Sequence, residues 1–345
     1  MNIPVEPVDQ SVAELARRLH ADALVIDACA PILRDHQYAR YWQAGGATCA
    51  LATVALAEDT PISTLATIGA FLRRARSHPD TCLALTADDI VQARATGRLA
   101  IVLMFQNSSP IGRNADLVEV YYRLGVRSMN LAYNQAEAAA DGCMETRNGG
   151  LSTFGRRVVE EMNRVGMLLD LSHTGYRSSM EAMERSTAPV AFSHSNAARV
   201  FDHPRNLRDD QIDACVATGG VIGLNGHPVF VKAGTASPTI DDLLRHLFYL
   251  IERAGIDHVG LGLDFSQPPG EQMTLARYNW LQEEGVWLPG TLPPPPWAYP
   301  VADASQLPRL TEAMLRAGLD EADTRKILGE NFLRLFRSVW REVGC

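Results

Sequence analysis

The chain has 345 residues, 46% of them hydrophobic, and carries a formal net charge of −8. Its length and apolar content are sufficient for a large buried core. The acidic balance argues against nucleic acid or an anionic membrane surface as the main partner, so small solutes are the expected ligands.

The N-terminal stretch 1–20 has no apolar core of the kind found in a signal peptide, and no segment reaches the ~20 apolar residues of a membrane span. The chain has six cysteines, which are Cys29, Cys49, Cys82, Cys143, Cys215 and Cys345. No two of them form a Cys-x-x-Cys pair. Free thiols in a reducing compartment fit this pattern best. The sequence therefore predicts a cytoplasmic protein.

Apolar runs of strand length recur along the chain, each followed by a segment with helical spacing of apolar residues. The runs are 23–30, 48–57, 99–106, 126–133, 166–173, 188–195, 219–226 and 258–265. Continuous rather than alternating apolar residues are typical of parallel strands covered on both faces. Eight such units predict a closed (β/α)8 barrel of the TIM type, in one domain over 1–345. A doubly wound open sheet is the competing architecture, but no Gly-x-Gly-x-x-Gly follows the first run.

Polar or reactive residues end seven of the eight predicted strands, and only the second strand ends without one. They are Cys29, Gln106, Tyr133, His173, His194, Asn225 and Asp264. Since the carboxyl ends of barrel strands meet at one face, these side chains are expected to share a pocket. His173 and His194 end consecutive strands, which favours a metal-binding or catalytic pair over two buried core histidines.

Asp264 and Arg205 are candidates for contact with substrate. Asp264 can accept a proton or bind an ammonium group, and its alternative role is a helix N-cap. Arg205 lies in the loop after His194, where it can hold a carboxylate bidentately or make a surface salt bridge, and His203 and Arg208 share this uncertainty.

Gln106 ends the run Leu-Ala-Ile-Val-Leu-Met-Phe-Gln at 99–106. Its amide can both donate and accept hydrogen bonds, which suits either substrate binding or, through the oxygen, a weak metal ligand. Cys29 is either a nucleophile or a buried inert thiol, and no partner histidine for it is evident in the sequence.

The segment 266–303 is rich in Trp, Tyr and Pro and follows the last predicted strand. At the catalytic face it is expected to form a lid over a small-molecule pocket. Its aromatic residues include Trp280, Trp287, Trp297 and Tyr299. These side chains can line that pocket or contact a second subunit in a homodimer.

Together these residues resemble the membrane (renal) dipeptidases of the amidohydrolase-like barrels. The matching motifs occur in the family's order and are "DLSH" (170–173), "FSHSNA" (192–197), "HPRNLRDDQ" (203–211), "GGVIGLN" (219–225) and "KILGENFLRLF" (326–336). The last of these implies a C-terminal helix at about 321–341.

Those dipeptidases use two zinc ions to activate a bridging water that attacks the amide of a dipeptide. The resemblance implies that His173 and His194 match the histidines of the second zinc. It further implies that Arg205 matches the arginine that holds the substrate carboxylate, and Asp264 the acid or base near the substrate's amino end.

The chain departs from the family at the first zinc. The family's His-x-Asp pair is replaced by Cys29 and Pro31, its bridging glutamate by Gln106, and the histidine after strand four by Tyr133. The two-zinc site cannot form from these residues. The remaining residues can hold at most one zinc, with His173, His194 and Gln106 as ligands and an open position for water.

Three functions remain open from the sequence. The first is hydrolysis of a dipeptide or small amino-acid amide, with Asp264 as proton shuttle and a substrate site formed by Arg205, Gln106, Asn225, Trp297 and Tyr299. The second is metal-free lyase or isomerase chemistry, with His173 or His194 as base and with Tyr133 and Gln106 polarising the substrate. The third is a binding protein without catalysis.

Overall fold

A computed structural model describes residues 10–56, 58–234, 237–288, 290–291, 293 and 295–341. Its strands are β1 (Ile26–Ala30), β2 (Cys49–Ala55), β3 (Thr81–Leu83), β4 (Leu99–Phe105), β5 (Val126–Asn130), β6 (Leu168–Asp170), β7 (Ala191–Phe192), β8 (Val221–Leu224) and β9 (Val259–Leu261). All pairings are parallel, and eight strands close in the order β1-β2-β4-β5-β6-β7-β8-β9, with β9 paired to β1. The predicted (β/α)8 barrel is confirmed.

The short strand β3 is a feature that the apolar runs did not predict. It pairs with the first part of β4, Thr81 opposite Leu99, while β5 pairs with the last part of β4, Met129 opposite Phe105. Every residue of β4 is buried, as expected of a barrel strand covered on both faces.

The strands are shorter than the predicted runs. For example, β7 has only two residues, 191–192, within the run predicted at 188–195. The polar residues predicted to end strands therefore lie mostly in the first residues after them, where the backbone is free to leave the sheet and aim a side chain into the barrel mouth.

The helices between the strands begin and end with conventional signals. They are α1 (Gln10–Asp22), α2 (Ala39–Ala44), α3 (Pro61–Ser77), α4 (Ala87–Ala95), α5 (Leu117–Arg123), α6 (Thr153–Val165), α7 (Tyr176–Arg185), α8 (Asp209–Ala217), α9 (Ile240–Ala254), α10 (Leu275–Glu283), α11 (Leu307–Arg316), α12 (Glu321–Arg325) and α13 (Asn331–Val339). The Ser152 hydroxyl caps the first turn of α6, and Gly166, at φ 85°, ends that helix in the left-handed conformation.

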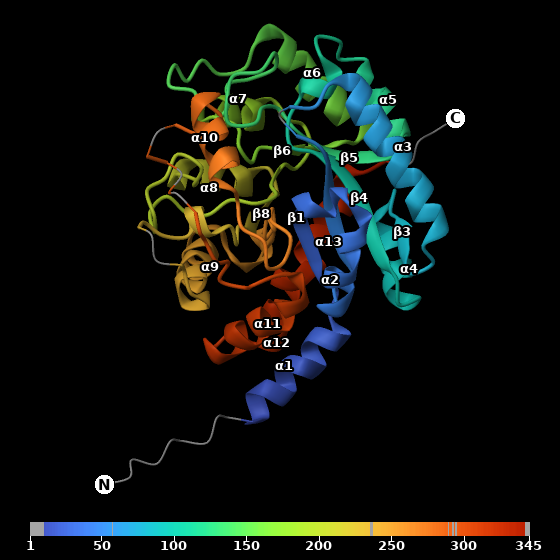
Figure 1. Ribbon diagram of the computed structural model, residues 1–345, viewed down its shortest axis with the longest axis vertical. Helices are drawn as coiled ribbons and strands as arrows, with labels where there is room; N and C mark the ends of the chain where they lie inside the picture. The colour runs from blue at the N-terminus through green and yellow to red at the C-terminus, as the bar shows by residue number, and fades with distance from the viewer. Residues whose placement is uncertain are drawn as a thin grey trace.

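The predicted C-terminal helix at about 321–341 is interrupted. A π-helical turn at 326–330 separates α12 from α13, which ends at Val339. Gly329 in this turn packs so closely on the Leu24 carbonyl oxygen that a Cβ would lie 2.5 Å from it, which accounts for glycine there. Figure 1 shows α1, α11 and α12 together at one end of the molecule.

The predicted lid segment 266–303 contains helix α10 and is therefore not wholly irregular. It packs through its own apolar cluster on the loops after β5 and β8. The buried members of this cluster are Met144, Val229, Phe230, Leu281, Val286, Trp287 and Trp297. Among the described residues, no helix is both long and apolar enough to cross a membrane.

Helix α9 carries a carboxylate whose contribution to stability depends on pH. The backbone amide of Thr239, together with Lys232, lowers the pKa of Asp242 from its usual value to about 2. Because the pKa is depressed in the folded state, the stabilisation is present above the unfolded pKa of about 3.9 and is lost as pH falls toward the folded value.

We therefore expect Asp242→Asn to lower the free energy of unfolding by about 1 kcal/mol at neutral pH, and by progressively less as the medium is acidified below about pH 4. Urea unfolding of both proteins at several pH values measures this difference. A difference that stays constant across the acid range would contradict the assignment.

Candidate active site

The residues that follow the barrel strands line a cavity of about 790 Å³. Gln106, Tyr133, His173 and Asp264 contribute to its wall from four different strand ends. The lid segment contributes Trp280, Leu281, Val286, Trp287 and Trp297. The cavity thus combines polar groups from the barrel with aromatic walls from the lid, as small-molecule sites commonly do.

His173 and His194 meet at this face, with their Nε2 atoms 3.0 Å apart. Both rings are buried, and burial, reinforced by the nearby Arg205 guanidinium, holds the pKa of each well below its usual value. Both imidazoles are therefore neutral at physiological pH.

The hydrogen bonds around the two rings define where their protons lie. Arg205 Nε can only donate, and it lies 3.1 Å from Nδ1 of His173, so that nitrogen accepts and the ring proton is on Nε2. His194 Nε2 then accepts from His173, and His194 Nδ1 donates to Ser193 Oγ at 2.6 Å. Ser193 in turn donates to the buried carboxylate of Asp170.

Asn134 completes the surroundings of His173. Its side-chain amide lies 2.7 Å from His173 Nδ1 through Oδ1, while its Nδ2 is buried and has no partner in the described part of the chain. The opposite orientation of this amide would give Nδ1 a second donor and Nδ2 a partner. Since Nδ1 accepts from Arg205, only this opposite orientation makes the contact with Asn134 a hydrogen bond.

Arg205 is buried behind the histidines rather than on the surface. Besides His173, it donates to Ser195 Oγ at 2.8 Å and to the His194 carbonyl oxygen at 2.9 Å. Arg205 does not line the 790 Å³ cavity but an adjoining one of about 540 Å³, which His173 separates from the first. Its observed contacts hold the two histidines, and its predicted contact with a substrate carboxylate remains a prediction.

Asp264 reaches the cavity from the loop after β9. Burial raises its pKa to about 7, with the Arg205 charge opposing the rise. Its Oδ1 accepts from Cys29 Sγ at 3.6 Å, and Asn225 Nδ2 lies 3.5 Å from its Oδ2. A carboxyl group with this pKa can exchange a proton near neutral pH.

Two residues predicted to bind substrate make contacts that hold neighbouring groups in place, and their substrate-binding role stays a prediction. Asn225 donates to the carbonyl oxygen of His194 at 3.2 Å. Tyr299 donates its hydroxyl to the backbone carbonyl of Asp264 at 2.9 Å and accepts from the Ser266 amide. Neither lines the 790 Å³ cavity, whereas Trp297 does.

Gln106 and Cys29 lie side by side. Gln106 Nε2 is 3.1 Å from Cys29 Sγ and 3.0 Å from Thr53 Oγ1, so it donates to both. Thr53 belongs to β2, the strand for which the sequence indicated no site residue. Burial and the nearby carboxylates, Asp264 foremost, raise the pKa of the Cys29 thiol well above its usual value.

His173 and Asp264 share an unusual backbone conformation. Their φ angles are 66° and 57°, and the only other described non-glycine residue with a positive φ is Asn148. This conformation costs an L-residue roughly 1–2 kcal/mol. Strain of this kind gathers at functional sites, where the surrounding structure enforces it.

Sequence reasoning missed His227, which lines the cavity two residues after Asn225. Its ring lies among the rings of Phe230, Trp297 and Tyr299, and burial lowers its pKa to about 3. Nδ1 is buried and has no hydrogen-bond partner among the described residues. Its place just after β8 matches that of the other site residues and could have identified it.

Glu137 was also missed, although it joins the loops after β4 and β5. Its carboxylate accepts from the backbone and hydroxyl of Ser108 and from the Tyr133 amide, all at 2.8–2.9 Å. Burial raises its pKa. It holds the backbone that carries Tyr133, whose ring stacks on His173 with centroids 4.0 Å apart.

We expect Glu137→Gln to destabilise the fold by about 1–3 kcal/mol, because an amide nitrogen would face donors that the carboxylate now satisfies. Thermal unfolding measures this loss, and Glu145→Gln, in the same loop region, is the matched control. An unchanged melting temperature would contradict the role assigned to Glu137.

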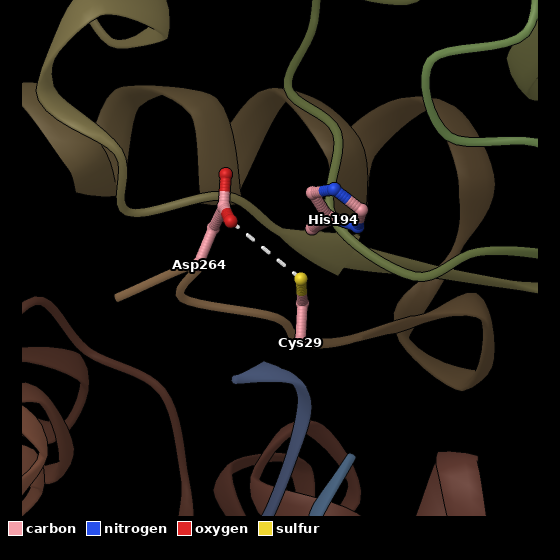
Figure 2. A group of neighbouring side chains, drawn as sticks. All are labelled: Cys29, His194 and Asp264. Carbon is pink, nitrogen blue, oxygen red and sulfur yellow. Dashed lines mark hydrogen bonds between the residues drawn. The ribbon is translucent and has the colours of Figure 1, made fainter. Parts of the chain in front are cut away.

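Three of these side chains form a group able to hold a metal ion. Ligand atoms of Cys29, His194 and Asp264 all lie within 4.8 Å of one another. Figure 2 shows them converging from three separate segments, with the contact between Cys29 and Asp264 dashed. Among the residues that the structure describes this is the one compact donor set, and Pro31, two positions after Cys29, offers no side-chain ligand atom.

Comparison with known proteins identifies a family for the chain. The model of the membrane dipeptidase family (Peptidase family M19) matches residues 35–284. The chain belongs to the membrane dipeptidase family. Within it, the chain is 32% identical over 261 residues to the dipeptidase verJ of Clonostachys rogersoniana and 29% identical over 259 residues to the dipeptidase tcpJ of Claviceps purpurea.

The matched regions cover 74% of this chain but only 60% and 55% of those two relatives, so this family member spans little more than half their length. A crystal structure of an amidohydrolase from Pseudomonas aeruginosa is 33% identical, with a TM-score of 0.84 over 95% of this chain and 99% of that one. A metallopeptidase from Rhodobacter sphaeroides, liganded with a phosphinate mimic of L-Ala-D-Ala, shares the fold, with a TM-score of 0.76 and 24% identity over 92% of this chain and all of that one.

Proposed function

We propose that this chain hydrolyses a dipeptide or a similarly small amide derived from amino acids. The observation that carries the proposal is the cavity of about 790 Å³ at the mouth of a dipeptidase-family barrel, with the carboxyl group of Asp264 in its wall beside Cys29 and His194. A volume of this size accommodates a small ligand rather than a folded protein.

The donor groups near Asp264 fit one divalent cation. Cys29, His194 and Asp264 lie close enough to hold it, and His173 Nε2 is 3.0 Å from His194 Nε2. Gln106, predicted as a ligand, has its amide nitrogen directed toward Cys29. When bound, such an ion supplies a water of lowered pKa and polarises the amide carbonyl.

The chain's own residues supply the proton transfers and the orientation of the substrate. Asp264 takes a proton from the attacking water and returns it to the leaving amine through Oδ2, the oxygen that does not contact Cys29. The Tyr133 hydroxyl and Nδ1 of His227, which has no hydrogen-bond partner among the described residues, are available to hydrogen-bond the substrate. Trp287 and Trp297 provide apolar walls that limit the access of water.

Incubation with a panel of dipeptides and chromatographic detection of the released amino acids tests this proposal. Release of both amino acids from at least one dipeptide is expected, with the Asp264→Asn protein as the control for contaminating peptidases. No hydrolysis of any dipeptide by metal-replete protein would overturn it.

A further inference from the structure

We infer that the barrel mouth is a mononuclear metal site ligated by the thiolate of Cys29, the imidazole of His194 and the carboxylate of Asp264, with Gln106 as a hydrogen-bond donor to the sulfur. The inference deepens the proposed function and rests on it for the chemistry that the ion would serve. Its metal-binding test does not depend on that chemistry.

The positions of the three ligand atoms support a shared ion. Cys29 Sγ and Asp264 Oδ1 are 3.6 Å apart, which is close to the roughly 3.5 Å expected between two atoms bound to the same tetrahedral zinc at about 2.0–2.3 Å. The ligand atom of His194 lies within 4.8 Å of both. All three residues are at most 6% exposed, so the ion would be shielded from bulk water.

The contacts of His194 prepare it as a ligand. Its Nδ1 donates to Ser193 Oγ, which donates to Asp170, so the lone pair of the ring is on Nε2. An acceptor behind the imidazole is the usual arrangement in metal sites, because it fixes the tautomer and orients the ring.

His173 differs from His194 in this respect. Arg205 donates to its Nδ1, which leaves the ring proton on Nε2 and makes that nitrogen a donor rather than a ligand. The sequence alone treated the two histidines as equivalent. Their hydrogen bonds assign the ligand role to His194. Binding an ion at His194 Nε2 would use the lone pair that now accepts the His173 N–H, so that contact would open and leave His173 as a nearby donor.

The charges of the set balance. The thiolate of Cys29 and the carboxylate of Asp264 neutralise a dication, while His194 and Gln106 are neutral. The N–H of Gln106, 3.1 Å from Cys29 Sγ, stabilises negative charge on the sulfur. A glutamate in the place of Gln106 would set a carboxylate against that thiolate, so the two departures from the family, Cys29 and Gln106, are matched to each other.

Cobalt substitution tests the ligand set without measuring activity. The full-length protein is stripped with a chelator and titrated with Co²⁺, and its absorption spectrum is recorded. We expect a near-ultraviolet sulfur-to-cobalt charge-transfer band that saturates at one Co²⁺ per chain. It should be absent in Cys29→Ser and retained in Cys82→Ser, the control for a half-buried thiol in β3.

Two further measurements keep the test decisive if the Cys29 variant folds poorly. In Gln106→Leu the band should persist at one Co²⁺ per chain but move to longer wavelength, because the sulfur has lost its donor. X-ray absorption of the wild-type protein loaded with zinc should show a sulfur at about 2.3 Å from the metal.

Cobalt binding without a charge-transfer band, a band retained in Cys29→Ser, or no binding of cobalt would overturn the ligand set. Hydrolysis of dipeptides in the absence of the band would refute this inference while leaving the proposed function standing. The band without hydrolysis of any dipeptide would do the reverse.

Discussion

Replacing Asp264 by Asn is expected to lower kcat/KM for a dipeptide by about 10³-fold while leaving the fold intact. Asparagine has nearly the same shape, so the contacts with Cys29 and Asn225 can be kept in altered form. It has no carboxylate, however, either to take up a proton or to ligate the ion. Steady-state kinetics with a dipeptide measures the effect, and a thermal melt verifies folding.

The matched control for this substitution is Asp213→Asn, which changes an exposed carboxylate on α8 paired with Arg253. Its kcat/KM should stay within a few-fold of wild type. Activity of Asp264→Asn comparable with wild type would remove Asp264 from the reaction and with it the proton-transfer scheme.

Replacing Arg205 by Lys is expected to lower kcat by about 10²-fold. A lysine has one nitrogen and cannot reproduce the three contacts with His173, Ser195 and the His194 carbonyl oxygen. The His173 ring would therefore lose its fixed orientation, and the His194 backbone would lose a donor. Charge is retained in this variant, which separates geometry from electrostatics.

A dipeptide and its C-terminal amide distinguish the two roles available to Arg205. If Arg205 acts by holding the histidines, Arg205→Lys lowers kcat for both compounds by the same factor. If it binds the substrate carboxylate, as the family resemblance implies, the loss falls on the free acid, chiefly in KM. If kcat and KM of wild type and variant were equal for both compounds, both roles of Arg205 would be contradicted.

Much of the fold and of the site could be predicted because parallel barrel strands are continuous apolar runs. A run such as 99–106 therefore indicates both a strand and the side chain that follows it. The short strand β3 has no such run, because it is only three residues long and two of them, Cys82 and Leu83, are half-buried. The hydrophobic pattern of a short segment cannot identify a strand such as β3, which exists only because it pairs with β4.

The partners of the site residues could not be predicted, because they are set by the closed barrel. Gln106 and Thr53 are 53 residues apart in the chain, and Cys29 and Asp264 are 235 apart. The seven strand-end residues did gather at one face. Only the three-dimensional structure distinguishes those that line the cavity, such as Tyr133, from those behind it, such as Asn225. Spacing along a sequence carries no information on that depth.

The most direct test of a dipeptidase with one metal ion per chain is to measure dipeptide hydrolysis as a function of metal content. Chelator-stripped protein is titrated with Zn²⁺, and the rate of amino-acid release is followed at each ratio. We expect no activity without metal and a maximum at one Zn²⁺ per chain, lost in His194→Ala. Hydrolysis that survives complete removal of metal, or no hydrolysis at any ratio, would contradict a mononuclear dipeptidase and favour metal-free chemistry or simple binding.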